Sequence, residues 1–235
     1  MTALLIDLDG RADTANLGDL AVRAVRAAPR DDLAAVAELA EVAGWILFEE
    51  ERQGEAHAHN VLALSLARRA GDAGVEALTL LNMAMQRTRV GRFAESLALA
   101  RLGRSRSPST RVRAMFALRE ARTYSRVGLA SAAREALVRG EEVLADDPLA
   151  PPWAWWVDET ELAGHRAAVL ANLGHLEEAA ALFPPDDGLR FREVLGAMRF
   201  RTLTALGEWT GPPPTFTSPR ARHTAGIAQR PARPL

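Results

Sequence analysis

Apolar residues recur at every third or fourth position along most of the chain. The stretches LAAVAELAEVAGWILF (33–48) and VLALSLARRAG (61–71) are typical, and alternating runs of β-branched residues are missing. The pattern therefore predicts an all-α fold. Glycine and proline residues divide it into about ten helices. The predicted helices span residues 17–28, 32–50, 54–70, 74–90, 92–103, 109–127, 129–145, 158–173, 175–183 and 188–206.

Glycines at the predicted turns form a repeat. Gly91, Gly128 and Gly174 are 37 and 46 residues apart, and Gly207 follows 33 residues later. The residues seven before and five after the first three glycines are small: Ala84, Ala121 and Ala167, then Ser96, Ala133 and Ala179. An earlier unit has Gly44 and Ala56 at these offsets, around the turn EERQG. This spacing predicts an α-solenoid of about four to five antiparallel helical hairpins, each packed against its neighbours.

These repeats resemble the tetratricopeptide-repeat (TPR) family. The family pattern has a small residue, an aromatic residue, a turn glycine, an alanine and a second aromatic residue. Its best matches are Ala121, Tyr124, Gly128 and Ala133, then Ala167, Gly174, Ala179 and Phe183. The resemblance covers residues 33–210 and implies hairpins around a concave groove, with the last unit lacking its second helix.

Four segments look like the C-terminal TPR region of actinobacterial Xre-family transcriptional regulators. They are LAEVAGWILFEE, LARRAGD, LLNMAMQ and PPWAWWVDETELAG. In that family the TPR region is a sensor or interaction module that follows a helix-turn-helix domain. Here the repeats begin at about residue 33, which leaves too little chain for such a domain before them. We therefore expect regulation through a partner and no direct DNA binding.

The resemblance also assigns candidate ligand-binding residues, because the first helices of TPR hairpins line the concave groove. The candidates are Trp45, Phe48, Asn82, Met85, Arg89, Arg119, Arg122, Glu161 and His165; the same face includes Glu38, Glu41, Leu81, Leu118 and Arg201. Such a groove could bind a peptide or an organic anion, with arginine donating planar, charge-assisted hydrogen bonds. The alternative is that these charges are solvated or paired with one another.

The segment PPWAWWVDETELAGHR (151–166) contains three of the five tryptophans. Two prolines forbid a regular helix running in from residue 146, so WAWWV is expected to be non-helical. Asp158 and Glu161 then match a capping box that starts the next helix. The tryptophans, Trp153, Trp155 and Trp156, would lie at the edge of the groove. They form either a wall for an apolar or cationic ligand or a plug between repeats.

Chemistry other than binding has little support in the sequence. Glu161 and His165 lie one helical turn apart and could form an acid–base pair, but no serine or cysteine nucleophile is near them in sequence. His57 and His59 lie on different helix faces, so no metal site is expected. The chain has no cysteine and no lysine, which excludes thiolate chemistry and a lysine-containing phosphate loop. We expect no cofactor.

The ends of the chain differ from the repeats. Residues 1–32 are expected to form an N-terminal segment with one short helix. Residues 211–235 carry four arginines, no acid and several prolines, a composition that predicts a disordered tail. The tail could contact nucleic acid or an acidic partner weakly, or it could simply be solvated.

Three functional hypotheses follow. The first is a non-enzymatic TPR-like regulator or adaptor in the cytoplasm that holds a peptide, a protein segment or a small effector in its groove. The second is a helical-repeat enzyme with its site at the tryptophans, Glu161 and His165. The third is a structural protein that forms a homodimer through its incomplete last repeat. No stretch is long and apolar enough to predict a membrane span.

Overall fold

A computed structural model describes residues 2–9, 16–29, 31–141, 147–183, 192–212 and 214. Within these ranges the chain forms helices and no strands, which confirms the all-α prediction. The helices are α1 (Thr2–Asp9), α2 (Leu17–Ala27), α3 (Leu33–Glu49), α4 (Gln53–Ala70), α5 (Ala73–Arg89), α6 (Phe93–Arg106), α7 (Thr110–Arg126), α8 (Ala130–Glu141), the 3-10 helix η1 (Pro152–Trp156), α9 (Glu159–Asn172), α10 (Leu176–Leu182) and α11 (Arg192–Leu206).

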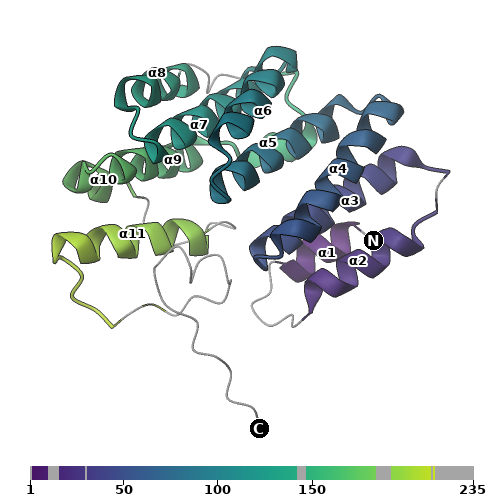
Figure 1. The fold of residues 1–235 in the computed structure, drawn as a ribbon, viewed down its shortest axis with the longest axis horizontal. Helices are drawn as coiled ribbons and strands as arrows, with labels where there is room; N and C mark the ends of the chain where they lie inside the picture. The colour runs from purple at the N-terminus through teal and green to yellow at the C-terminus, as the bar shows by residue number, and fades with distance from the viewer. Residues whose placement is uncertain are drawn as a thin grey trace, which may run out of the picture.

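Consecutive helices pack as pairs joined by short turns (Figure 1). The pairs are α3 with α4, α5 with α6, α7 with α8, and α9 with α10. The first helices also pack against one another in order, α3 on α5, α5 on α7, and α7 on α9. The helices α1 and α2 pack against α3 at one end of this row, and α11 packs against α9 and α10 at the other end.

The N-terminal segment differs from the prediction, because it contains two helices where one was expected. The additional helix, α1, is eight residues long, which is too short to give a clear periodic signal. It forms because it packs against α2 and α3, where its Leu5 is fully buried. Tertiary packing therefore stabilises a helix that its sequence alone does not specify.

The turn between the two helices of a pair has the same backbone each time. Gly91, Gly128, Gly174 and Gly207 all have positive φ angles, between 74° and 86°. In each turn the residue after the glycine donates a backbone hydrogen bond to a carbonyl in the preceding helix, as Arg92 does to Arg87 at 2.8 Å. Glu51 occupies this position in the first pair, with φ 61°. The glycine repeat thus marks a real structural repeat.

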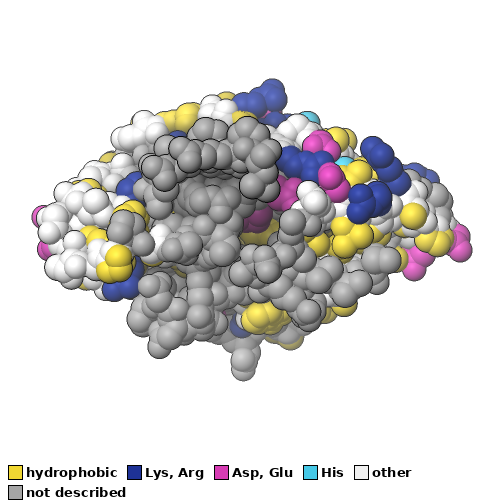
Figure 2. Space-filling model, turned by 90° about the horizontal axis from the view of Figure 1, so that it is seen from below, with side chains coloured by type: hydrophobic (Ala, Val, Ile, Leu, Met, Phe, Trp, Pro, Cys, Tyr) yellow, Lys and Arg dark blue, Asp and Glu magenta, His cyan; other side chains and the backbone are white. Residues whose placement is uncertain are grey.

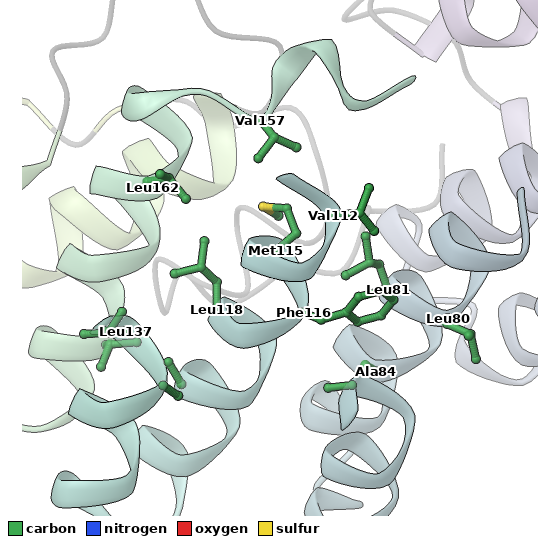
Figure 3. Packing of buried hydrophobic residues seen from close by; sticks show 14 of the residues in the cluster. Leu80, Leu81, Ala84, Val112, Met115, Phe116, Leu118, Leu137, Val157 and Leu162 are labelled. Atoms are coloured by element: carbon green, nitrogen blue, oxygen red, sulfur yellow. The ribbon is translucent and has the colours of Figure 1, made fainter. Parts of the chain in front are cut away.

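The small residues of the repeat lie where the paired helices meet. All of them are fully buried: Ala56, Ala84, Ser96, Ala121, Ala133, Ala167 and Ala179. The largest cluster of buried residues lies between α5, α6, α7, α8 and α9, and it includes Phe116 (Figure 3). A Cβ atom added to Gly103 of α6 would overlap the Phe116 ring. The close approach of α6 to α7 therefore requires a glycine at position 103.

Ion pairs join two of the first helices, α5 and α7, to the second helices on both sides. Glu76 of α5 binds Arg68 of α4 at 2.9 Å and Arg106 of α6 at 3.1 Å. Glu120 of α7 repeats this arrangement with Arg104 of α6 at 2.8 Å and Arg139 of α8 at 3.3 Å. The arginine-rich stretch 101–113 therefore contributes to packing between pairs.

Candidate functional site

Two apolar candidate residues, Phe48 of α3 and Met85 of α5, lie in the core. Phe48 and Met85 are buried in one cluster with Val22 of α2, and Trp45 packs against its edge. The helix α2 therefore covers this part of the row of first helices. Phe48 and Met85 do not lie on an open surface, as residues lining a groove would.

Glu41 and Asn82 form a buried polar pair between α3 and α5. The Asn82 amide donates from Nδ2 to Glu41 Oε1 over 2.5 Å, and Glu41 is 4% exposed. Burial is the main reason why the pKa of Glu41 rises to about 8, with the charge of Glu38 adding to the rise and the Asn82 bond opposing it. Glu41 therefore keeps its proton at neutral pH. The sequence placed Glu41 on this face but gave no sign of its protonation.

Arg89 is paired within the chain. Its Nη2 lies 2.9 Å from Oε1 of Glu51, the residue with positive φ in the first turn. This ion pair links the turn between α3 and α4 to the C-terminal end of α5. For Arg89 the expectation of internal charge pairing is thus confirmed.

Glu161 and His165 form a second polar pair, on the face of α9 that meets α7. The distance from His165 Nε2 to Glu161 Oε1 is 3.1 Å, and His165 is 4% exposed. Burial lowers the pKa of His165 to about 4, and the nearby Arg119 and Arg122 lower it further, against the effect of Glu161. Burial raises the pKa of Glu161, but His165, Arg119 and Arg122 outweigh this, so its pKa is lowered.

These shifts set the hydrogen-bonding state of the pair at neutral pH. Glu161 is ionised and His165 is neutral, so Nε2–H of the imidazole donates to the carboxylate. The other ring nitrogen, Nδ1, is then an acceptor. It is buried and has no hydrogen-bond partner among the described residues. A buried hydrogen-bond acceptor without a donor costs free energy, so the surroundings of His165 Nδ1 are unusual.

The helix α11 closes the corner formed by α7 and α9. Leu195 lies so close to α9 that a Cβ atom on Gly164 would overlap its side chain. The guanidinium of Arg122 reaches from α7 to α11, with Nη2 3.7 Å from Met198 Sδ. We call the region formed by Arg122, Arg126, His165, Met198 and Arg201 the α7–α9–α11 corner. The sequence predicted α11 but not that it would cover candidate residues.

The three neighbouring tryptophans have different environments. Trp153 donates from Nε1 to the Gly74 carbonyl at 3.0 Å, and its ring centroid is 6.1 Å from that of Trp156. Both pack against the main core cluster, whereas Trp155 is 66% exposed. Trp153 and Trp156 therefore fill the joint between α5 and the segment before α9, as a plug would. They do not enclose the Glu161–His165 pair with Trp155 as a closed aromatic wall.

Local structure around the tryptophans corrects two predictions. Residues 152–156 form the 3-10 helix η1, because Pro152 at its first position is compatible with a helical turn. Asp158 caps α9 as expected, since Oδ1 accepts from the backbone N–H of Glu161 at 2.9 Å. In a complete capping box the Glu161 carboxylate would accept from the Asp158 backbone N–H. Here that carboxylate bonds His165 instead, and the Asp158 N–H donates to the Trp156 carbonyl.

The C-terminal end of α11 is the place where the third hypothesis expects the chain to form a homodimer. Phe200 stands seven residues before Gly207, where the other repeats have a small residue. It packs edge-on against Trp209, with ring centroids 5.0 Å apart. Trp209 thus takes part of the space that a second helix would fill. No large apolar side chain in the described part of α11 is strongly exposed.

The described residues contain no group of three or more histidine and acidic side chains placed to hold a metal ion. None of the described helices is long and apolar enough to cross a membrane. On the described surface seen from below, acidic and basic side chains lie next to one another (Figure 2). The predicted tail from residue 215 onward lies outside the described residues.

Comparison with known proteins finds no matching family model, no matching curated protein and no matching solved structure. The arguments about function therefore depend on the geometry. That geometry includes two buried polar pairs on the first helices, and one of them lies beside arginines in the α7–α9–α11 corner.

Proposed function

We propose that this chain is a TPR-like helical solenoid that acts as a non-enzymatic binding module. It would hold a peptide or a small effector on the face of its first helices, which we expect to form a concave groove. One observation carries the proposal: α3, α5, α7 and α9 pack side by side with repeated turns, and two polar pairs, Glu41–Asn82 and Glu161–His165, lie on these helices. Arrays of this kind present extended binding surfaces.

The burial of the candidate residues limits where on this face a ligand could bind. At the α3–α5 end, α2 covers Phe48 and Met85. Arg122 and Glu161, by contrast, are only partly buried, and Arg126 and Arg201 are exposed. We therefore place the ligand at the α7–α9–α11 corner, where charged groups remain accessible.

Binding explains this corner better than catalysis. A general base must be reachable by its substrate, and the His165 ring is almost entirely buried. Its low pKa follows from burial and makes it a weak base at neutral pH. Of the tryptophans that the enzyme hypothesis needs as walls of the site, Trp153 and Trp156 pack against the core and Trp155 is mostly exposed. The Glu161–His165 pair is better suited to fixing the face of α9 against α7.

A role in regulation rests on the resemblance to the TPR regions of Xre-family regulators. On that basis the chain would act as a regulator or adaptor, with a partner that supplies DNA binding. Because each helix pair contacts its neighbours, a ligand that favours one curvature of the array would also change the affinity for such a partner.

A thermal-shift screen tests the proposal. The wild-type chain is screened against small metabolites and short peptides, and binders are titrated against Arg122→Gln and Arg69→Gln variants. Arg69 is exposed on the second helix α4, so its variant is the matched control. We expect binders whose affinity falls at least tenfold in Arg122→Gln and less than twofold in Arg69→Gln. Binders that are equally weakened by both changes, or by Arg69→Gln alone, would contradict this location.

A further inference from the structure

The helix α2 is a short amphipathic helix that lies on the first helices of the row (Figure 1). Its buried residues share one face and are Leu17, Gly18, Ala21, Val22 and Val25. Three of them pack with residues of α3, and Val22 lies in a cluster with Phe48 of α3 and Met85 of α5. The outward face carries Arg23 and Arg26, which are exposed. The helix α2 therefore occupies the position that a helical ligand would take on this face.

Two charged residues in the turn between α3 and α4 hold the first turn of α2. The Gly18 backbone N–H donates to Glu50 Oε1 at 2.7 Å, and Arg52 Nη1 lies 2.8 Å from Asp19 Oδ1. Glu50 and Arg52 also pair with each other at 3.2 Å, so the turn presents them together. A carboxylate is favourable at the free backbone N–H groups of a helix N-terminus, and the arginine complements the acidic residue there. We call Glu50 and Arg52 the helix clamp.

The helix clamp also discriminates between helices by the size of one residue. A Cβ atom on Gly18 would overlap the Glu50 carboxylate, so a larger residue there would push the carboxylate away from the backbone N–H. The clamp therefore fits a helix with glycine and then an acidic residue in its first turn. Apolar residues follow at intervals of three to four, at the positions that Ala21, Val22 and Val25 take in α2.

The surface beneath α2 has the composition of a protein interface. Trp45 and Phe48 lie with their ring centroids 6.1 Å apart, and Met85 belongs to the same cluster. Aromatic residues and methionine are enriched in interfaces, and methionine adapts its shape to different partners. The residue that α2 contributes to this cluster is Val22, and Trp45 stays only partly buried. A helix with larger apolar side chains would therefore bury more of this surface.

The contacts that hold α2 are those of an element that opens locally. Eleven residues are too few for a helix that is stable by itself, so α2 depends on these contacts. The ion pair of the clamp is partly in solvent, because the Asp19 side chain is 51% exposed and the Arg52 side chain 29% exposed. Such pairs contribute little to stability and are screened by salt. We therefore expect α2 to detach while the helix pairs stay folded.

We propose that the surface of α3 and α5 beneath α2, together with the helix clamp, is a docking site for an amphipathic helix of a partner protein. In the free chain α2 occupies this site. The partner helix carries glycine and an acidic residue in its first turn and competes with α2. The site lies at the α3–α5 end of the row, whereas the α7–α9–α11 corner lies at the other end, so the inference does not depend on the ligand proposed there.

Fluorescence anisotropy of a labelled peptide with the sequence of residues 16–29 tests the site on the full-length chain. The peptide is titrated with the wild type and with an Asp19→Asn/Val22→Ala variant, which weakens the contacts of α2 and leaves the docking surface unchanged. The peptide should bind the variant at least tenfold more tightly than it binds the wild type. A peptide carrying Val22→Asp should bind the variant at least tenfold more weakly than the unchanged peptide does.

Three further variants serve as controls. Arg23→Gln/Arg26→Gln changes exposed residues on the outward face of α2 and should bind the peptide within twofold of the wild type. Arg52→Gln, added to the Asp19→Asn/Val22→Ala variant, removes half of the helix clamp and should weaken peptide binding at least threefold. Arg122→Gln, added to the same variant, changes the other end of the row and should leave peptide binding within twofold.

Hydrogen–deuterium exchange of the wild type gives a second measurement that does not depend on the folding of a variant. Amides of α2 should exchange at least tenfold faster than those of α3, because α2 opens while the row stays folded. Equal rates would mean that α2 is a permanent part of the core and would overturn the inference.

Two other results would also overturn it. One is that the peptide binds the wild type and the Asp19→Asn/Val22→Ala variant equally, or binds neither. The other is a wild-type dimer, measured by light scattering, that the peptide dissociates, because the occupant would then be α2 of a second copy. If ligands from the screen still depend on Arg122 in any of these cases, the proposed function survives and only the docking site fails.

Discussion

Asn82 donates a 2.5 Å hydrogen bond to Glu41, and the two side chains join α5 to α3 out of reach of solvent. A carboxyl group in this position is kept neutral, because an ionised one would have to give up its hydration without a cation to replace it. The pair makes the packing of the first two helix pairs sensitive to pH.

The first prediction concerns Glu41→Gln. The pKa of Glu41 is about 8 in the folded chain and near 4.5 when unfolded, so the folded state binds more protons between these values. Wild-type stability should therefore fall as pH rises from 5 to 7.5, by at most about 1.4 kcal/mol per pH unit from this group. Glutamine mimics the protonated acid and should remove that contribution. Urea unfolding of both proteins at pH 5 and 7.5 measures the difference.

The control for this experiment is Glu135→Gln, which removes an exposed carboxylate in the middle of α8. Its stability should follow the wild-type dependence on pH. Parallel pH profiles for the wild type and Glu41→Gln would show that Glu41 is ionised in the folded chain, contrary to our account.

The second prediction concerns the protonation of His165. Its pKa is about 4 when folded and 6.5 when unfolded, so the neutral ring contributes stability above pH 6.5 that is lost as pH falls toward 4. In a proton NMR titration, the imidazole signal that disappears in His165→Gln should not shift between pH 8 and 5.5. A midpoint at 6.5 or higher would mean that the ring is accessible or charged.

The third prediction concerns the turn glycines. Gly128 has φ 75°, and no atom lies within 4 Å of the place where a Cβ would be, so Gly128→Ala introduces backbone strain without a steric clash. We expect a loss of about 1–2 kcal/mol in the free energy of unfolding. Gly54→Ala is the counterpart, because Gly54 lies in α4 with equally open surroundings. It should stabilise the chain by about 0.5–1 kcal/mol, and equal effects of both changes would contradict the assignment of the turn.

The fourth prediction compares the contributions of Trp153 and Trp155 to stability. Trp153→Phe removes the hydrogen bond to the Gly74 carbonyl and should cost about 1–2 kcal/mol. Trp155→Phe changes a side chain that is mostly in solvent and should alter stability by less than about 0.5 kcal/mol. Thermal unfolding of the two variants measures both effects. A larger loss for Trp155→Phe would mean that Trp155 is part of the plug.

The repeat could be predicted from the sequence because it depends on local requirements. A turn with positive φ favours glycine, and helices in close contact need small residues, so Gly91 and Gly128 appear with small residues at fixed offsets. The first turn follows the same backbone path with Glu51, which no glycine marks in the sequence. Glu51 is less favourable than glycine at a positive φ, and its side chain forms an ion pair with Arg89.

The candidate site was less predictable, because burial depends on which distant helices cover each face. The spacing on α5 places Met85 on the expected face, but α2 covers that face, so Met85 is in the core. By contrast, Arg122 stays only partly buried although it contacts Met198 of α11.

Hydrogen–deuterium exchange tests the central claim, that ligands bind on the face of the first helices, most directly. Exchange is measured for the whole chain with and without the tightest binder from the thermal-shift screen. Our account predicts slower exchange in α7, α9 and α11, with little change in the second helices α4, α6 and α8. Slower exchange confined to α4, α6 and α8 would place the binding surface on the opposite side and contradict the account.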